Sequence, residues 1–408
     1  MKLASLDVII TGNPPPGQGG RYFIFVKLTT QCGIVGWGEV YAASVGPAAM
    51  RAVIADVFER HFEGRHPRDV EAAFRSAYSS GFTQRPDLTV MGAFSGLEIA
   101  CWDIWGKALG QPVWALLGGH VTDRLRAYTY LYPEAGEDAG AFYSSPERAG
   151  EVAAAWADQG MTAVKFDPAG PYTIHGGHQP GLSDLDRAEA FCARVREGVR
   201  DRADILFGTH GQFTPSGAIR MAERIAKYDP LWFEEPCPPD TGVEGWRQIV
   251  GASRMPIAAG ERLTTLPEFA ALAAAGVGVL QPALGRAGGL WHGKKIATIA
   301  EAHSAQIAPH LYAGPIEWLA NLHLGATCSN TLLVETIGDG GGFHGELIPG
   351  GPRVEGGYIA VPTGPGLGFE LNETLARENV YEGKDLHLTM QREPIRYDGS
   401  TQPFAKGD

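Results

Sequence analysis

The sequence predicts an α/β protein built on a closed barrel of parallel strands, preceded by a smaller α+β domain. From about residue 125, short apolar runs alternate with amphipathic helical patterns, an order typical of repeated βα units. There are eight such runs, and eight regularly alternating strands are enough to close a (β/α)₈ barrel. An open doubly wound sheet is the alternative, but no GxGxxG turn follows the first run, so a dinucleotide site is not expected.

Each apolar run is interpreted as a buried strand. The runs are RAYTYLY (126–132), TAVKFD (162–167), DILFGTH (204–210), LWFEEP (231–236), PIAAGE (256–261), VGVLQP (277–282), QIAPHL (306–311) and LLVET (332–336). Helical patterns lie between them, for example over 145–160, 184–200 and 289–304. Because the active sites of such barrels lie at the C-terminal ends of the strands, the polar residues that end these runs are the candidates for a site.

The regions on either side of the barrel have a different character. Residues 21–30 and 33–41 predict two paired strands, and residues 46–62 and 95–119 carry helical periodicity. We therefore expect three units, and the last of them, which is strand-like and glycine-rich, is expected to return to the first: an α+β domain over 1–122, the barrel over 123–350 and a C-terminal segment over 351–408.

The composition predicts a soluble globular protein, since 44% of the 408 residues are hydrophobic and 20% are charged. A formal net charge of −12 without a basic block argues against a nucleic-acid partner, and an anionic substrate would need local cations to hold it. Five scattered cysteines without a CxxC pair indicate reduced thiols in a cytoplasmic protein. No signal peptide or membrane-spanning segment is expected, because no apolar stretch is long enough.

Two glutamates close neighbouring strands, Glu234 in WFEEP and Glu261 in AAGE. Carboxylates from adjacent strand ends can share one hard cation, and Mg²⁺ accepts such a site with water and substrate oxygens completing its octahedron. The alternative is that each glutamate caps a helix or pairs with an arginine such as Arg262. Barrel catalysis draws on several strand ends, which favours the metal site.

Lys165 lies inside the apolar run AVKFD, where a lysine is costly to bury unless it is paired or used. Asp167 follows two residues later and is expected to face the same side of the strand. A local ion pair between the two is the structural alternative to a role in the site.

Two histidines end strands at the same mouth of the barrel. His310, in APHLYAGP, is suited to act as a general base near neutral pH, and His210, in FGTHGQF, is suited to act as the complementary acid. Glu335 ends the last run, where it could orient a base, hold the substrate or cap the next helix. The long loop after the second run adds residues that either contact substrate or are simply solvated: Tyr172, His175 and His178.

A metal flanked by a lysine and two histidines is suited to proton abstraction next to a carboxylate. The enediolate that forms must be stabilised, which a divalent ion on the carboxylate oxygens can do while a Lys or His acts as base. If the β-carbon bears a hydroxyl, an acid on the other face can expel it as water.

Seven motifs follow one another along the chain: EIACWDIWGKALGQPVWALLGG, VKFD, WFEEP, AAGERL, LQPALGRAGG, APHLYAGP and PGLGFELNE. Together they resemble the enolase superfamily in its mandelate racemase group, and within it the galactonate dehydratases and related acid-sugar dehydratases. The resemblance spans nearly the whole chain. It implies a modified (β/α)₇β barrel, a capping domain completed by the C-terminal segment, a Mg²⁺ cofactor and a homo-oligomer.

The resemblance also implies roles for individual residues. Glu234 and Glu261 match two of the family's three metal ligands. Lys165 matches the first lysine of the family's KxK motif, and His310 matches the base on strand seven. His210 matches the acid on strand three, and Glu335 matches the strand-eight glutamate that bonds the substrate carboxylate.

Three positions depart from the family pattern. Gly208 stands where the family has its first metal-binding aspartate, Asp167 where many members have the second lysine of KxK, and Ala283 where an aspartate usually pairs with the strand-seven histidine. Asp167 is then expected either to bind the metal or to hydrogen-bond His210 and fix its orientation. Direct ligation by His210 is a weaker option, because Mg²⁺ prefers oxygen.

The loss of a carboxylate at Ala283 bears on the choice of base. His310 then needs another acceptor to set its tautomer, or it is a weaker base. Lys165 or a residue of the strand-two loop is therefore a stronger candidate for the base than the family pattern alone would make it. The sequence thus predicts a Mg²⁺-dependent dehydratase that converts a sugar acid to a 2-keto-3-deoxy acid. A racemase or cycloisomerase of the same superfamily, and a non-catalytic barrel that binds a sugar acid, are the alternatives.

Overall fold

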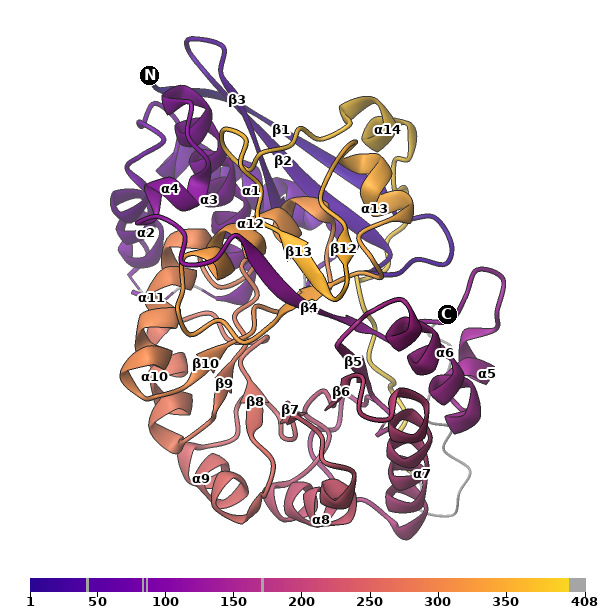
Figure 1. Cartoon of the computed structure of the whole chain (residues 1–408). Helices are drawn as coiled ribbons and strands as arrows, with labels where there is room; N and C mark the ends of the chain where they lie inside the picture. Colours follow the sequence, from indigo (N-terminus) through magenta and orange to yellow (C-terminus); the bar gives the residue numbers. More distant parts are fainter. Residues whose placement is uncertain (42–43, 83, 86, 170–171, 396–408) are drawn as a thin grey trace.

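The computed structural model describes residues 1–41, 44–82, 84–85, 87–169 and 172–395. Figure 1 shows a barrel of strands ringed by helices, with a smaller domain packed against it. The predicted fold class, a (β/α)₇β barrel with an N-terminal capping domain, is confirmed. None of the helices in these ranges is both long enough and apolar enough to cross a membrane.

The capping domain contains a three-stranded antiparallel sheet in the order β1-β2-β3. Its elements are β1 (Leu3–Gly12), β2 (Tyr22–Thr30), β3 (Val35–Val40), α1 (Pro47–His61), α2 (Val70–Ser79), α3 (Leu88–Leu109) and α4 (Val113–Leu116). Helix α3 lies directly against β3 because glycines leave room for it. A Cβ atom on Gly38 would lie 1.9 Å from the carbonyl oxygen of Gly96, so no larger residue fits at this crossing.

Eight parallel strands form the barrel, one for each apolar run of the sequence. They are β4 (Arg124–Tyr130), β5 (Ala163–Phe166), β6 (Asp204–Phe207), β7 (Trp232–Glu234), β8 (Ile257–Ala259), β9 (Val279–Leu280), β10 (Gln306–Ile307) and β11 (Val334–Thr336). The strands pair in sequence order from β4 to β10, and β11 pairs with β4. A parallel bridge between Ile307 and Thr331 joins β10 to the residues before β11 and closes the ring.

Long helices follow the first seven barrel strands and cover the outside of the ring (Figure 1). They are α6 (Pro146–Asp158), α7 (Leu182–Val199), α8 (Pro215–Ile225), α9 (Val243–Ala252), α10 (Leu266–Ala275), α11 (Gly289–Ala302) and α12 (Pro315–Ala326). Three shorter helices are α5 (Ala139–Phe142), the 3₁₀ turn η1 (Ala226–Tyr228) and α13 (Gly342–Leu347). The eighth strand is followed by the short α13 where the others have a long helix, which makes the barrel a (β/α)₇β one.

The C-terminal segment runs back along both domains. Its elements are β12 (Val354–Glu355), β13 (Tyr358–Ala360) and α14 (Glu373–Glu378). Strand β13 pairs with the start of β4, and the amide of Leu367 donates to Asp103 Oδ1 of α3 at 2.9 Å. Lys27 of β2 pairs with Glu373 of α14 at 2.6 Å. The expected division of the chain at residues 122 and 350 stays a prediction.

One inward side chain from each barrel strand, or from the residue next to it, fills the space below the mouth. This layer consists of Tyr128, Ala163, Leu206, Trp232, Ala258, Val279, Ala308 and Leu333. The rings of Tyr128 and Trp232 meet edge to face at 5.4 Å, and the alanines of three other strands leave room for them. Because side chains alternate along a strand, the residues two positions further on point inward at the mouth itself.

Two buried glutamates of the capping domain bind the N-termini of barrel helices. Glu39 of β3 accepts hydrogen bonds at the start of α12 from the amides of Gly314 (2.5 Å), Ile316 (3.2 Å) and Glu317 (3.0 Å). Glu98 of α3 accepts in the same way at the start of α11, from Leu290 and Trp291 at 2.8 and 2.9 Å. The first amides of a helix have no partner within it, so these carboxylates satisfy them and fix the cap on the barrel.

Candidate active site

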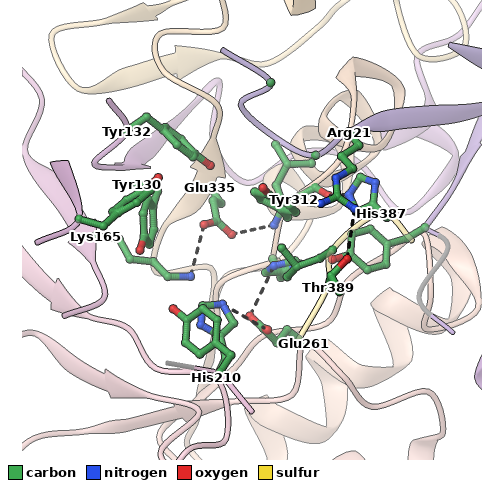
Figure 2. A pocket seen from close by; sticks show the side chains of 18 of the residues that line it. Arg21, Tyr130, Tyr132, Lys165, His210, Glu261, Tyr312, Glu335, His387 and Thr389 are labelled. Atoms are coloured by element: carbon green, nitrogen blue, oxygen red, sulfur yellow. Dashed lines mark hydrogen bonds and ion pairs between the residues drawn. The ribbon is translucent and has the colours of Figure 1, made fainter. Parts of the chain in front are cut away.

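A cavity of about 370 Å³ lies between the barrel mouth and the capping domain. Its walls come from the capping domain near residues 17–21, from the ends of the barrel strands and from residues 387–391 of the C-terminal segment. Figure 2 shows side chains from these three parts pointing toward one another. Five of the residues predicted for the site line this cavity: Lys165, His210, Glu261, His310 and Glu335.

The positions two residues beyond the inward apolar layer carry most of the predicted site. They hold Lys165 on β5, Glu234 on β7, His310 after β10 and Glu335 on β11. Gly208, after β6, is the position of this layer where the family pattern has a carboxylate and this chain has no side chain. The strand period of two therefore places both layers inside the barrel, the apolar one below and the charged one at the mouth.

Lys165 is held between two glutamates and is 2% exposed. Its ammonium pairs with Glu234 Oε1 and lies 3.4 Å from Glu335 Oε1. Burial alone would lower the pKa of Lys165, but the charges of Glu234 and Glu335 outweigh burial and hold the pKa well above its usual value. Lys165 is therefore a fixed cation at neutral pH.

The two glutamates beside Lys165 use their other oxygens as acceptors. Gln281 Nε2 donates to Glu234 Oε2 at 2.7 Å, and the amide of Leu311 donates to Glu335 Oε2 at 2.7 Å. Burial raises the pKa of Glu335 to about 7 against the opposing charge of Lys165. Glu335 thus joins the ammonium to the loop that follows β10.

His210 is oriented by Asp167. The Nδ1 atom of His210 lies 2.8 Å from Asp167 Oδ2, which also accepts from the hydroxyl of Tyr172, while Asp167 Oδ1 accepts from the amide of Ala169 at 3.0 Å. Burial would lower the pKa of His210, but the hydrogen bond with Asp167 and the charge of Glu261 raise it. Of the two roles predicted for Asp167, this geometry supports orientation of His210, because both carboxylate oxygens already accept from the chain.

Glu261 lies among two histidines and an arginine. Its Oε2 is 3.4 Å from His310 Nε2, and its Oε1 is 3.9 Å from His210 Nε2 and 3.8 Å from Arg262 Nε. Burial would raise the pKa of Glu261, but the neighbouring imidazoles of His310 and His210, together with the cations Lys165 and Arg262, hold it well below its usual range. Glu261 is therefore an ionised carboxylate shared by the two imidazoles, and the arginine expected as an alternative partner is also present.

His310 is buried and neutral. Burial lowers its pKa to about 3 against the attraction of Glu261. Its Nδ1 has no hydrogen-bond partner among the described residues, in agreement with the missing carboxylate at Ala283. Asn321 of α12 donates to the carbonyl oxygen of His310 at 3.0 Å, and Glu39 binds the start of that helix. The capping domain thus fixes the backbone of His310.

Of the three residues singled out in the loop after β5, one lines the cavity. Tyr172 lines the cavity and bonds Asp167. His175 lies with its Nε2 2.9 Å from the carbonyl oxygen of Arg392, and His178 packs near the ring of Phe213, so neither lines the cavity. Residues 170–171 of this predicted loop fall outside the described ranges.

Sequence reasoning missed an aromatic wall of the cavity. It consists of Tyr41, Tyr130, Tyr132, Tyr143, Tyr312 and His387. Arg21 of the capping domain adds a guanidinium, and its Nη1 donates to Leu386 O and Thr389 Oγ1, both at 3.1 Å. One signal was present in the sequence, since alternate tyrosines in the run RAYTYLY place phenol rings on one face of the strand.

Both domains match family models of known proteins. Residues 18–118 match the mandelate racemase / muconate lactonizing enzyme N-terminal domain, and residues 147–375 match the enolase C-terminal domain-like family. The second match alone covers more than half of the chain. The chain therefore belongs to the enolase superfamily, in its mandelate racemase group.

Particular relatives narrow the comparison. The chain is 33% identical to the D-galactonate dehydratase of Verminephrobacter eiseniae over 377 residues, which cover 89% of this chain and 92% of that protein. It is 31% identical to the D-gluconate dehydratase of Thermoproteus tenax over 392 residues, covering 95% of this chain and 75% of that one. These names describe carbon–oxygen lyases, and they confirm the predicted class of enzyme.

Solved structures extend the likeness to the whole fold. A mandelate racemase/muconate lactonizing enzyme-like protein from Roseovarius sp. TM1035 is 58% identical to this chain, with a TM-score of 0.95 over 97% of this chain and 100% of that one.

Members of the enolase superfamily generally use Mg²⁺, an ion that requires oxygen ligands in octahedral geometry. Across the described part of the chain, no group of three or more His, Cys, Asp or Glu side chains is placed to hold a metal ion. Gly208 offers no side-chain ligand, Glu234 is paired with Lys165, and Glu261 faces His310 and His210. The described residues therefore do not fit the magnesium site predicted at Glu234 and Glu261.

Proposed function

We propose that this protein is a sugar-acid dehydratase, which removes water from a 2,3-dihydroxy acid and gives a 2-keto-3-deoxy acid. The named relatives that are dehydratases support the reaction class. The observation that carries the proposal is the pair of histidines, His310 and His210, which line one cavity from two strand ends and whose pKa values are shifted in opposite directions.

His310 takes the proton from the carbon next to the substrate carboxylate. Its depressed pKa leaves the imidazole neutral across the physiological range, so a nitrogen lone pair is free to accept a proton. Lys165, the other predicted base, is held as an ammonium by Glu234 and Glu335 and has no lone pair to offer. The electron pair of the broken C–H bond moves into the carboxylate and forms the enediolate.

His210 protonates the departing hydroxide. Asp167 holds its Nδ1, so the proton on Nε2 is the one available to the cavity. As the bond from the β-carbon to oxygen breaks, that proton converts the leaving hydroxide to water. The enol that remains gains a proton at the β-carbon and loses its hydroxyl proton, which gives the 2-keto acid. Solvent returns the proton gained by His310 to His210, so the net change is the loss of one water.

The rest of the cavity suits a polyhydroxylated acid. Phenol hydroxyls can donate to and accept from sugar hydroxyls while their rings pack on the carbon chain. Glu335 and Lys165 lie at the barrel end of the cavity, and Arg21 lies on its capping-domain side (Figure 2). A homo-oligomeric state and a cytoplasmic location stay predictions.

The test is a turnover screen over five- and six-carbon aldonic acids, in which 2-keto products are detected by semicarbazide. A 2-keto-3-deoxy product from at least one acid supports the proposal. Deuterium uptake at the α-carbon in heavy water without any keto product would favour a racemase or cycloisomerase. Binding of a sugar acid with neither exchange nor product would favour the non-catalytic barrel.

A further inference from the structure

The missing side chain at Gly208 and the position of Lys165 are linked. A Cβ atom on Gly208 would lie 3.2 Å from Lys165 Cε and 3.3 Å from the carbonyl oxygen of Phe166, both tighter than ordinary van der Waals contact. Any larger residue would therefore press on the lysine chain in its present place. Glycine here both removes the carboxylate of the family pattern and makes room for the aliphatic part of Lys165.

The ammonium of Lys165 lies where two strand-end carboxylates converge. It meets Glu234 of β7 and Glu335 of β11, and it approaches the ring of Tyr128 at 5.9 Å from the centroid. All of these partners are buried, so the low local dielectric strengthens each attraction. One positive charge is thus fixed at the floor of the cavity by the chain itself.

The remaining carboxylates of the mouth also face donors from the chain. Asp167 accepts from Ala169, Tyr172 and His210, while Glu261 faces His310, His210 and Arg262. Glu235, behind them, accepts from the amide of Gly260 at 2.8 Å and lies 3.7 Å from Arg262. A divalent cation would have to break several of these pairs and would still lack a third carboxylate at Gly208.

We propose that the Lys165 ammonium, fixed between Glu234 and Glu335, takes the place of the divalent cation and stabilises the enediolate, so that this enzyme works without Mg²⁺. The proposal rests on the dehydratase reaction proposed above, and it attributes the loss of the metal site to Gly208. The proton leaves the α-carbon for His310, and the charge that develops on the carboxylate oxygens meets a preorganised cation in a site shielded from water.

Two glycine variants test the cause directly. Gly208→Asp adds the missing carboxylate, and Gly208→Ala adds the same Cβ atom without a ligand. Calorimetric titration with MgCl₂ and MnCl₂ is expected to show no stoichiometric site in the wild type or in Gly208→Ala. In Gly208→Asp one site is expected, at least about tenfold tighter than any residual binding in the alanine variant.

The wild-type protein alone supplies the second readout. Deuterium exchange at the substrate α-carbon should change by less than about twofold after dialysis against EDTA, because the cation belongs to the chain. Binding of one Mg²⁺ per wild-type chain, or loss of exchange with EDTA and its return with Mg²⁺, would overturn the proposal even if neither variant folds. If no sugar acid is a substrate, the proposed function is wrong. The metal titration would still decide whether the wild-type chain has a Mg²⁺ site.

Discussion

Buried carboxylates gather in two regions of this molecule, and their partners differ in kind. At the interface between cap and barrel, Glu39 and Glu98 accept mainly from backbone amides that open α12 and α11. At the barrel mouth, Glu234 and Glu261 meet ammonium, imidazole and guanidinium groups. A backbone amide keeps its proton throughout the physiological range, whereas an imidazole can lose or gain one.

This difference in partners separates glutamates with a structural role from glutamates with a role in the reaction. A carboxylate on helix amides fixes two elements in one geometry and serves that purpose in any protonation state of the site. A carboxylate on titratable side chains shifts their pKa values, as Glu261 raises those of His210 and His310 against the effect of burial. Substitutions at the mouth should therefore change rate and pH dependence, and substitutions at the interface should change stability.

The largest effect is expected for Lys165→Met, which leaves Glu234 and Glu335 buried without their cation. Breaking one partner out of a buried pair typically costs about 3–5 kcal/mol, and we expect a loss of that size together with loss of turnover. Urea unfolding gives the stability change. The control is Lys227→Met at the pair with Glu189, where the lysine side chain is 61% exposed and the loss of stability should be far smaller. Equal costs at the two lysines would contradict the fixed-cation interpretation.

The next largest effect is expected for His310→Asn. Removing a general base lowers the rate by roughly 10²–10⁴-fold, so α-carbon deuterium exchange should fall by at least about 10²-fold. Stability should fall less than in Lys165→Met, since His310 Nδ1 has no partner among the described residues and Nε2 gives up only a 3.4 Å approach to Glu261. Retained exchange in this variant would rule out His310 as the base.

A smaller effect is expected for Asp167→Asn, a change to a positioning residue. The hydrogen bond with Asp167 and the charge of Asp167 are two of the three influences that raise the pKa of His210, so the variant should lower that pKa. Activity needs His210 protonated, and it is therefore lost as pH rises through this pKa. The alkaline limb of the kcat profile should move to lower pH, with kcat reduced roughly tenfold to hundredfold, less than removal of the acid would cause.

The matched control for that variant is Tyr172→Phe, which removes one donor to Asp167 but leaves the carboxylate on His210. Its alkaline limb should not move to lower pH. An unmoved limb in Asp167→Asn would mean that Asp167 serves structure only.

The smallest effect is expected at the interface, for Glu98→Gln. Burial raises the pKa of Glu98 to about 7, so the folded protein keeps a proton that the unfolded chain releases above a pH of about 4.3. Wild-type stability should therefore be greatest at acidic pH and fall as pH rises toward 7. The glutamine variant should lack this contribution and stay within about 1 kcal/mol of wild type at pH 5. Thermal unfolding at pH 5 and pH 8 checks the slope, and turnover per folded molecule should not change.

Much of the fold was predictable because its elements follow from local pattern. The eight apolar runs correspond to eight strands, and five of the polar residues that end them line the cavity at the mouth. Strand β1 and helix α2 were not predicted. The burial pattern of β1 is irregular over its first half, so the alternation expected of a strand is weak there.

The pairing of the site residues was less accessible to sequence reasoning. Lys165 and Asp167 are two residues apart and invited a local ion pair, yet Lys165 pairs with Glu234 and Asp167 with His210. These choices depend on how far each side chain reaches across the barrel and on the room left by Gly208. Neither the reach of a side chain nor the room beside it can be predicted from residue spacing along one strand. The aromatic wall was missed for the same reason, since it assembles residues from three parts of the chain.

The hydrogen bonds between Glu39 and the start of α12 have a consequence for folding during synthesis. The glutamate and the first amide that it binds are 275 residues apart, so the ribosome delivers the acid long before its partner. At about 5–20 residues per second, that gap lasts roughly 14–55 s, during which Glu39 in the sheet of the cap has no helix to bind. Chains stalled before residue 314 should therefore lose the capping domain to a protease that spares it in chains released after α12 has emerged.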